Sequence, residues 1–282
     1  MADYYPSKIP HREVIGLLPA AGKATRLARL PCSKELYPIG FQNLANGRGL
    51  HSKPICIYLL EKMRLAGISK AYIILRKGKW DIPAYLRDGG MLGMHLAYLM
   101  MNLPFGVPYT LDQAYPFLNN STVALGFPDI IFRPDDAFVQ LLARQAQSNA
   151  DIVLALFPAH QPNKADMVDV DADGRIREIQ VKPARTHLRF AWVIAVWTPV
   201  FTQFMHEYLA RILDGTRQHD TGDNLPESRE LFVGDVIQAA IDDNLHVEGI
   251  IFQDGTYLDI GTRDNLFQAV RDSVLQEDIK RK

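Results

Sequence analysis

The sequence has little cysteine and lacks the common nucleotide-binding motifs. Cys32 and Cys56 are its two cysteines, and neither belongs to a CxxC or Cys/His pattern, so a zinc site or disulfide framework is not expected. The chain contains no Walker P-loop, which needs Gly-Lys-Ser/Thr, and no GxGxxG turn. The absence of that turn argues against a dinucleotide-binding oxidoreductase.

The sequence also has no excess of positive or negative charge and no long hydrophobic run. Lys and Arg total 31 against 32 Asp and Glu, which gives a net charge of −1 with no block of like charge. This balance argues against nucleic acid or an anionic membrane as the main partner. No apolar run reaches the ~18 residues that span a bilayer, and residues 1–14 lack the apolar core of a signal peptide. We therefore expect a cytoplasmic protein.

Short apolar runs alternate with helix-length segments through the first half of the chain. Strands are expected at 14–18, 71–75, 97–101, 122–127 and 151–157. Helices are expected from Lys53-Pro54 to Gly67, and at 81–87, 108–118 and 134–147. This alternation predicts a Rossmann-like α/β fold, in which a mostly parallel sheet is covered by helices on both faces. Ligands of such sheets bind beyond the carboxyl ends of the strands.

The second half predicts a smaller, mixed α/β region. Asp173-Gly174 is a strong turn signal between strands at 167–170 and 175–181. Further elements are expected as a strand at 190–197, a helix at 199–213, a polar loop at 217–229, a helix at 231–243, a strand at 247–252 and a helix from 263. With 282 residues, the chain can form one large α/β domain or two small ones.

The stretch 14–39 carries the strongest functional signal. An apolar strand ends at Leu18 and is followed by the small residues Ala20, Ala21 and Gly22. A tight turn of this kind exposes several N–H groups together, which favours an anion. Arg26 and Lys34 follow the turn. The guanidinium of an arginine presents a rigid fork of N–H donors, and the ammonium of a lysine is a compact point charge. A polyphosphate is therefore the expected ligand.

These residues resemble a known family. The segments 21–27 (AGKATRL) and 33–39 (SKELYPI) are similar to the A-G-x-G-T-R-L and P-K-x-L-x-P-[IV] signature of the sugar-1-phosphate nucleotidyltransferases, also called NDP-sugar pyrophosphorylases, such as glucose-1-phosphate thymidylyltransferases and uridylyltransferases. Ala24 replaces the second glycine. Arg26 and Lys34 are eight positions apart, whereas many members have about ten.

Two aspartates match the family's metal-binding positions. Asp129 follows an expected strand in the segment 125–132 (LGFPDIIF), and Asp259 lies in 257–266 (YLDIGTRDNL). The resemblance implies that both bind the catalytic Mg²⁺, an ion that combines a few carboxylates with phosphate oxygens and water. From the residues alone, Asp129 could equally cap a turn, and Thr262 could cap the last helix just after Asp259.

Two further motifs are altered. Val181-Lys182-Pro183 resembles the family's Glu-Lys-Pro, which implies that Lys182 binds the sugar phosphate; Val181 replaces the glutamate that usually contacts sugar hydroxyls. The segment 98–106 (YLMMNLPFG) resembles Y-V-V-Q-x-x-P-x-G. Gly106 is kept, but Met101 replaces the glutamine that usually reads the base.

The resemblance implies transfer of a nucleotide from an NTP, with dTTP or UTP favoured, to a sugar 1-phosphate, with glucose 1-phosphate favoured. Arg26 would act on the β- and γ-phosphates, and Lys34 on the α-phosphate. The implied nucleotide-binding residues are Leu18, Ala20, Ala21, Gly22, Thr25, Met101 and Gly106. The expected organisation is a single domain over 1–282, with a nucleotide-binding half at about 10–160 and a sugar-phosphate-binding half at about 161–282.

Two alternatives keep the fold but change the function. Val181 and Met101 leave open a phosphocholine-type cytidylyltransferase. Ala24 and the shortened signature leave open a catalytically weak homologue that binds a nucleotide-sugar and regulates a partner. The retained cations and both aspartates argue against the second alternative, because a non-catalytic binder need not keep them. Self-association is left open by the sequence.

Overall fold

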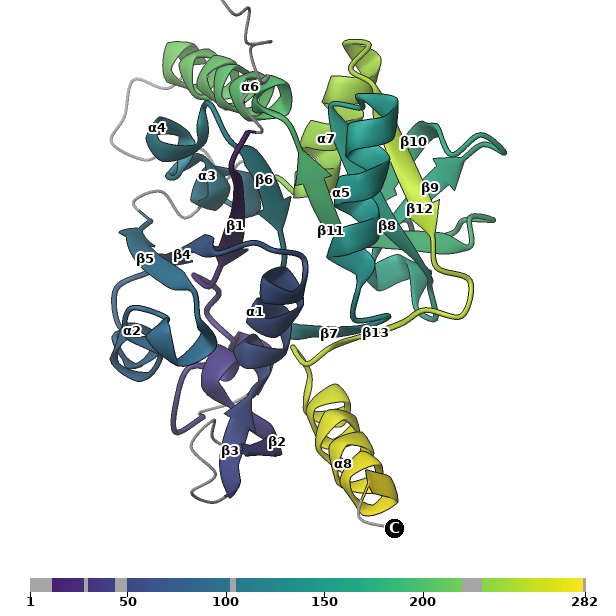
Figure 1. Ribbon diagram of the computed structural model, residues 1–282. Helices are drawn as coiled ribbons and strands as arrows, with labels where there is room; N and C mark the ends of the chain where they lie inside the picture. Colours follow the sequence, from purple (N-terminus) through teal and green to yellow (C-terminus); the bar gives the residue numbers. More distant parts are fainter. Residues whose placement is uncertain (1–11, 28–29, 44–49, 102–104, 220–229, 281–282) are drawn as a thin grey trace, which may run out of the picture.

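The computed structural model describes residues 12–27, 30–43, 50–101, 105–219 and 230–280. Within these ranges, a nine-stranded sheet runs through the molecule (Figure 1). Its strands are β1 (Val14–Pro19), β4 (Lys70–Leu75), β5 (His95–Met100), β6 (Thr122–Leu125), β8 (Ile152–Pro158), β9 (Asp166–Val170), β10 (Ile176–Val181), β11 (Phe190–Trp197) and β12 (Val247–Ile251). The main path is β10-β9-β11-β6-β1-β4-β5; off this path, β8 pairs with β11, and β12 pairs with β8.

Strand direction changes at β11. The strands β6, β1, β4 and β5 are parallel neighbours, and β12 is parallel to β8. In contrast, β11 is antiparallel to β6, β8 and β9, and β9 and β10 form an antiparallel hairpin. The parallel strands bring their carboxyl ends to one edge of the sheet, where α/β folds bind ligands.

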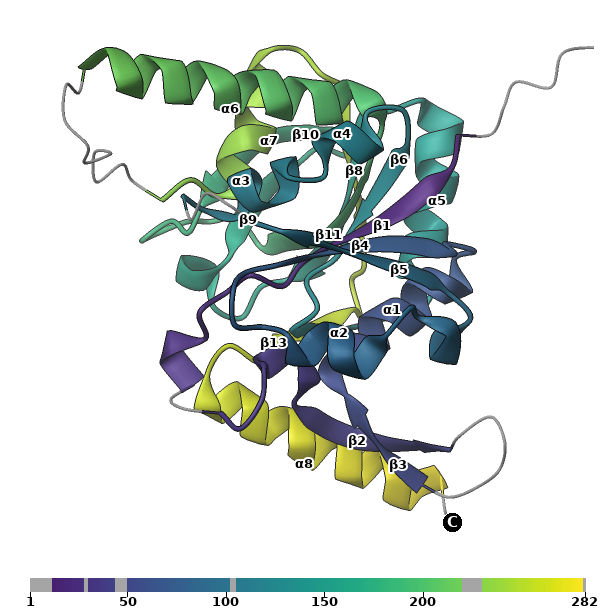
Figure 2. The ribbon, with the colours of Figure 1, turned by 90° about the vertical axis from the view of Figure 1, so that its left-hand side faces the viewer.

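Helices cover both faces of the sheet (Figure 2). One face carries α1 (Ile55–Leu65), α2 (Asp81–Leu86) and α5 (Ala137–Ser148). The other carries α3 (Val107–Asp112), α4 (Tyr115–Leu118), α6 (Pro199–His219) and α7 (Val233–Asp242). The strands between them are buried on both sides, as the apolar runs predict. Gly16 shows how close this packing is, because a Cβ there would lie 2.8 Å from the Met63 sulfur on α1.

Two small sheets stand outside the central one. Strands β2 (Pro38–Asn43) and β3 (Leu50–Pro54) form an antiparallel pair, and β7 (Ile130–Arg133) pairs with β13 (Thr256–Asp259). Helix α8 (Arg263–Lys280) packs on β2. A separate apolar cluster, which includes Ile39, Ile260, Leu266 and Ala269, joins these parts. The last helix is thereby tied to the hairpin near the start of the chain.

The predicted α/β architecture is present, and most expected strands and helices lie within a few residues of their predicted bounds. The predicted helix 108–118 is two short helices, α3 and α4. The hairpin β2–β3 and strand β7 were not expected. The predicted loop 217–229 begins inside α6, and its residues 220–229 lie outside the described ranges. Strands from both predicted halves share one sheet, and the division at 160 stays a prediction.

In the described part of the chain, none of the helices is long and apolar enough to cross a membrane.

A buried ion pair fixes the segment that precedes β2. This segment contains the 3₁₀ helix η2 (Lys34–Leu36). Both carboxylate oxygens of Glu35 accept hydrogen bonds from Lys79 Nζ, at 2.6 and 2.7 Å, and the two residues are 1 % and 5 % exposed. Burial raises the pKa of Glu35 and lowers that of Lys79, while their mutual attraction opposes both shifts. Ser33 donates its N–H and hydroxyl to Asp81 at 2.6 and 2.7 Å.

We expect that removing one member of this pair destabilises the protein strongly. Lys79→Met leaves the Glu35 carboxylate buried without its partner, which should lower the free energy of unfolding by about 3–5 kcal/mol. The double variant Glu35→Leu/Lys79→Met removes both charges, so it should be more stable than either single variant. Urea denaturation followed by circular dichroism measures the difference.

The exposed pair Lys70–Glu13 is the matched control. Lys70→Met should leave the free energy of unfolding nearly unchanged, because water screens exposed ion pairs. A loss for Lys79→Met as small as that for Lys70→Met would contradict a stabilising role for the buried pair.

Candidate active site

Two aspartates meet where β7 and β13 pair. Asp129 directly precedes β7, and Asp259 is the last residue of β13. The register joins Asp259 to Ile130, and the N–H of Ile260 donates to the Asp129 carbonyl at 3.1 Å. Figure 1 shows the two strands side by side below the central sheet. Residues 130 positions apart in the sequence are thus neighbours in space.

Lys34 joins this pair of aspartates. It is the first residue of η2, and its Nζ forms an ion pair with the Asp129 carboxylate, both side chains being largely buried. Burial lowers the pKa of Lys34, but Asp129 and more distant carboxylates, including Asp259, outweigh it, so the pKa lies above its usual value. The ammonium therefore stays charged at neutral pH.

Asp259 lies in a crowded and partly repulsive environment. Burial, and next the negative charge of Asp129, raise its pKa, while the Gly261 N–H, Lys34 and Arg26 oppose the rise. The Gly261 N–H donates to Asp259 Oδ1 at 2.7 Å. A Cβ at Gly261 would lie 2.9 Å from that oxygen and 3.1 Å from Arg26 Nη2. Arg26 thus borders the same site.

The donor set fits a divalent cation. The negative charge of Asp129 disfavours ionisation of Asp259, a repulsion that a bound cation would relieve. Among the described residues, no group of three or more His, Cys, Asp or Glu side chains gathers at one place. Two carboxylates nevertheless suit Mg²⁺, which commonly keeps water and phosphate oxygens in its remaining positions.

The predicted small-residue turn follows β1 directly. Leu18 and Ala20 are buried in the core, and the Ala20 N–H donates to the Ile74 carbonyl at 2.8 Å. A Cβ at Gly22 would lie 3.6 Å from Lys34 Nζ, so the end of this turn borders the cation. Ala24 has a positive φ of 54°. The residue that replaces a signature glycine therefore keeps a backbone conformation that glycine adopts more easily.

Thr25 begins the 3₁₀ helix η1 (Thr25–Leu27), which also carries Arg26. Ala21 is buried at the turn between β1 and this helix. The turn and η1 together thus lead the chain from the carboxyl end of β1 to the aspartates. The roles assigned to these residues stay predictions.

Met101 and Gly106 lie after β5. The Thr110 hydroxyl is 3.5 Å from the Met101 sulfur, a contact that occupies the side chain at the expected base-reading position. Gly106 has a φ of +123° and forms an isolated bridge with Leu231. A Cβ at Gly106 would lie 2.3 Å from the Leu231 carbonyl oxygen, so the close backbone approach itself requires glycine. Residues 102–104 of this motif lie outside the described ranges.

Lys182 belongs to a different segment from Lys34, Arg26, Asp129 and Asp259. It follows β10 with a positive φ of 44°, a conformation that is strained for a non-glycine residue. Its Nζ stands 3.5 Å from the centre of the Phe232 ring, immediately before α7. In the described chain, no ion pair joins Lys182 to the aspartates of the candidate site.

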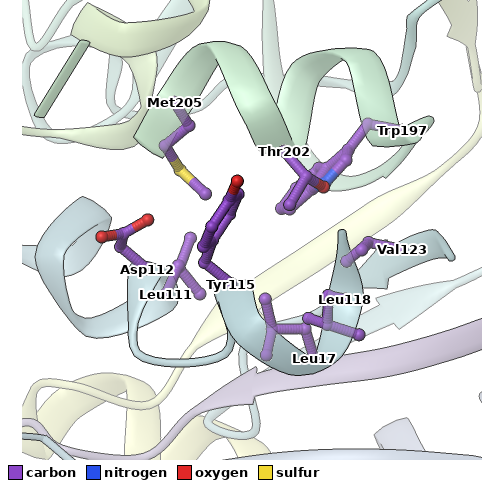
Figure 3. A pocket seen from close by; sticks show the side chains of 9 residues that line it. All are labelled: Leu17, Leu111, Asp112, Tyr115, Leu118, Val123, Trp197, Thr202 and Met205. Atoms are coloured by element: carbon purple, nitrogen blue, oxygen red, sulfur yellow. The ribbon is translucent and has the colours of Figure 1, made fainter. Parts of the chain in front are cut away.

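The clearest internal cavity is elsewhere (Figure 3). It lies between β1, α3, α4 and α6, has a volume of about 10 Å³, and is lined mainly by apolar side chains. That volume suffices for about one water molecule. The cavity is therefore a packing defect between helices and sheet, and the charged cluster is the better candidate for the chemistry.

Sequence reasoning missed several residues that support the candidate site. Glu35 stands next to Lys34 in the signature, but its partner Lys79 is distant in sequence and no local pattern indicates the pairing. Asp81 was assigned only to a short helix, yet it holds Ser33. Asp166 begins β9, and only the strand register shows that it lies opposite Val181.

The structure is that of an α/β protein in which Lys34, Arg26 and two aspartates gather at one place. Residues 15–275 match the family model described as nucleotidyl transferase. The chain belongs to that family, and the family predicted from the signature motifs is confirmed.

Similarity to individual proteins agrees with this membership. The chain is 22% identical over 258 residues to the low-salt glycan biosynthesis nucleotidyltransferase Agl11 of Haloferax volcanii, covering 90% of this chain and 64% of that protein. It is 29% identical over 181 residues to a glucose-1-phosphate thymidylyltransferase of Mycolicibacterium smegmatis, covering 62% and 58% of the two chains. The chain thus spans about three fifths of the length of these relatives.

A solved structure confirms the fold. A UDP-glucose pyrophosphorylase complexed with UDP-glucose superposes with a TM-score of 0.71 at 16% identity, covering 94% of this chain and 99% of that one. The predicted α/β fold with a mostly parallel sheet is therefore correct.

Replacing Gly261 should disturb the site while leaving the fold intact. In Gly261→Ala, the new methyl group displaces the ends of the Asp259 and Arg26 side chains, which can move without shifting the backbone. We expect the rate of nucleotidyl transfer to fall about 10- to 100-fold, because displacements near 1 Å are costly in active sites. Steady-state kinetics measure the rate, and thermal denaturation should show a shift of only a few degrees. An unchanged rate would contradict the expected geometry.

Proposed function

We propose that this protein transfers a nucleotide from an NTP to a sugar 1-phosphate, giving an NDP-sugar and pyrophosphate. The observation that carries the proposal is the convergence of Lys34, Arg26, Asp129 and Asp259. Two cations beside two carboxylates suit a reaction that brings polyanions together. Membership of the nucleotidyl transferase family supports the reaction class.

In the proposed reaction, an oxygen of the sugar phosphate attacks the α-phosphorus of the NTP. The bond from that phosphorus to the bridging oxygen breaks, and pyrophosphate leaves with the electron pair. No group on the protein needs to form a covalent bond, so positioning and electrostatic stabilisation supply the catalysis. Lys34 would contact the α-phosphate, and Arg26 the β- and γ-phosphates of the leaving group.

Asp129 and Asp259 would hold Mg²⁺, which when bound supplies positive charge to the phosphate oxygens. Lys34 forms an ion pair with Asp129, so the lysine and the cation would share one carboxylate. The small-residue turn after β1 would bind the nucleotide through its backbone, together with the segments around Met101 and Gly106. Lys182 would bind the phosphate of the sugar.

The favoured substrates are dTTP or UTP and glucose 1-phosphate. The relative from Mycolicibacterium smegmatis carries the name of a glucose-1-phosphate thymidylyltransferase, and the solved neighbour holds UDP-glucose. Met101 lacks the amide of the usual glutamine, so we infer that backbone groups contribute to base selection. A phosphocholine-type cytidylyltransferase is the second candidate, because Val181 removes a carboxylate from the expected sugar-binding motif.

The direct test measures pyrophosphate release with Mg²⁺. Four NTPs are crossed with the 1-phosphates of glucose, mannose, galactose and N-acetylglucosamine, and with phosphocholine. We expect turnover with a sugar 1-phosphate and a pyrimidine nucleotide. Turnover with phosphocholine alone would select the second candidate, and nucleotide-sugar binding without any turnover would select a regulatory homologue.

Replacement of either aspartate tests the proposed metal site. Asp129→Asn and Asp259→Asn should each lower turnover by about a thousandfold, since the charge stabilisation from such an ion amounts to several kcal/mol. Asp254→Asn changes an exposed aspartate five residues before Asp259 and should leave turnover unchanged. Near-normal turnover in either site variant would exclude a shared metal site.

A further inference from the structure

A second group of polar side chains lies where the β9–β10 hairpin meets α7. Asp166 begins β9, and its register partner across the antiparallel pair is Val181, the last residue of β10. Directly opposed residues of two antiparallel strands project from the same face. A carboxylate therefore stands beside Val181, immediately before Lys182.

Gly234 gives this carboxylate room. It is the second residue of α7, and a Cβ there would lie 2.6 Å from Asp166 Oδ2 and 2.9 Å from Val181 Cγ2. Any side chain at 234 would push into both neighbours. The Gly234 N–H lies close enough to the carboxylate to lower its pKa, as expected at a helix N-terminus.

Trp192 on β11 completes the group and leaves one buried donor unused. Its side chain is 8 % exposed, and its Nε1–H makes no hydrogen bond of normal geometry. This N–H faces Asp166 and lowers the pKa of that carboxyl. A buried donor without a partner is costly in a protein, so a ligand that accepts from Trp192 would remove the cost.

The neighbouring charges do not neutralise Asp166. Burial, and to a lesser extent the negative charge of Asp235, raise its pKa to about 6 against the lowering effects of Lys182, Trp192 and Gly234. Asp235 is already used, since it accepts the Phe232 N–H at 2.8 Å in the cap of α7. No ion pair joins Asp166 to a cation in the described chain. The carboxylate is thus held in a costly environment, and the neutral N–H groups of Trp192 and Gly234 compensate its charge only in part.

We propose that Asp166 and Trp192 bind a hydroxyl group of the sugar whose phosphate lies at Lys182. A sugar hydroxyl both donates and accepts a hydrogen bond, which matches an acceptor carboxylate paired with a donor indole. Asp166 thereby supplies, from the opposite strand, the carboxylate that Val181 lacks. This inference rests on the proposed function and identifies the polyhydroxylated ligand as the class that the subsite selects.

The same contacts disfavour phosphocholine. A quaternary ammonium has no lone pair and no N–H, so it would satisfy the charge of Asp166 but leave the Trp192 N–H buried and unpaired. Sites that offer a hydrogen bond reject ligands without the matching group far more strongly than apolar pockets reject a missing methylene. The pair therefore favours a sugar over choline.

The test combines deletion of substrate hydroxyls with variants that remove the carboxylate charge or the indole N–H. The wild-type protein, Asp166→Asn and Trp192→Phe are assayed with the productive sugar 1-phosphate and with its deoxy analogues, one hydroxyl removed at a time. For the parent sugar, each variant should lower kcat/KM about 10- to 100-fold, through KM for the sugar phosphate and not for the NTP. With the wild type, one deoxy analogue should lower kcat/KM by a similar factor, because it lacks the hydroxyl that the two residues bind. With this analogue, the variants should cause little further loss of kcat/KM.

Asp169→Asn is the matched control, because it makes the same change three residues further along β9 on the alternate side of the strand. It should leave both KM values and the deoxy pattern unchanged.

Thermal denaturation separates a loss of binding from a loss of folding. Above pH 6 the charged, buried Asp166 destabilises the folded state, so Asp166→Asn should keep or raise the melting temperature, whereas loss of a structural contact would lower it.

Three outcomes would overturn the inference. If the wild type is active but Asp166→Asn and Trp192→Phe keep its KM and its deoxy pattern, the hydroxyl subsite is wrong while the proposed function stands. If the wild type uses no sugar 1-phosphate, the proposed function and the subsite both fail. If Asp166→Asn gives uniform losses with every deoxy analogue and a lowered melting temperature, Asp166 has a structural role only.

Discussion

The pairing of β7 with β13 is the constraint on which the candidate site depends. Each strand has four residues, and a two-stranded ribbon of that length has little stability by itself. It persists because Phe132 and Ile260 are buried in core clusters on either side. That packing brings two carboxylates together despite their mutual repulsion, and Lys34 and Arg26 offset part of the repulsion.

Lys34 is held in the candidate site by means other than strand pairing. Lys34 belongs to a short 3₁₀ helix, which has no intrinsic stability to fix a side chain. The Glu35–Lys79 pair and the Ser33–Asp81 hydrogen bonds connect this helix to the segment after β4. A buried ion pair is an expensive connection compared with apolar packing. Its directional hydrogen bonds fix the orientation of the 3₁₀ helix, and with it the position of the Lys34 ammonium beside Asp129.

The local signals in the sequence predicted much of the fold. Apolar runs such as 71–75 and 190–197 predicted buried strands, and Asp173-Gly174 predicted the β9–β10 turn, because each depends on neighbouring residues. The antiparallel insertion of β11 between β6 and β8 depends on contacts far apart in the sequence, and no periodicity reports it. Strand β3 (LHSKP) is polar and ends in proline, so it lacks the alternation by which strands are recognised.

The candidate site shows the same difference between local sequence motifs and contacts that form only in the folded chain. The signature residues Arg26 and Lys34, and the aspartates 129 and 259, were identified by motif, and the structure brings them together; their roles stay predictions. Asp166 carries no motif. Its position matters only through the register with Val181 and the missing side chain at Gly234, which are properties of three segments that meet in the folded state.

The order of the strands along the chain has a consequence for biosynthesis. The central sheet is complete in sequence at Ile251, the end of β12, whereas Asp259 follows eight residues later on β13. The last strand of the central sheet therefore leaves the ribosome eight residues before the second carboxylate. The β7–β13 ribbon is added beside the central sheet, so the repulsion between the aspartates acts on this ribbon and not on the pairing of the central strands.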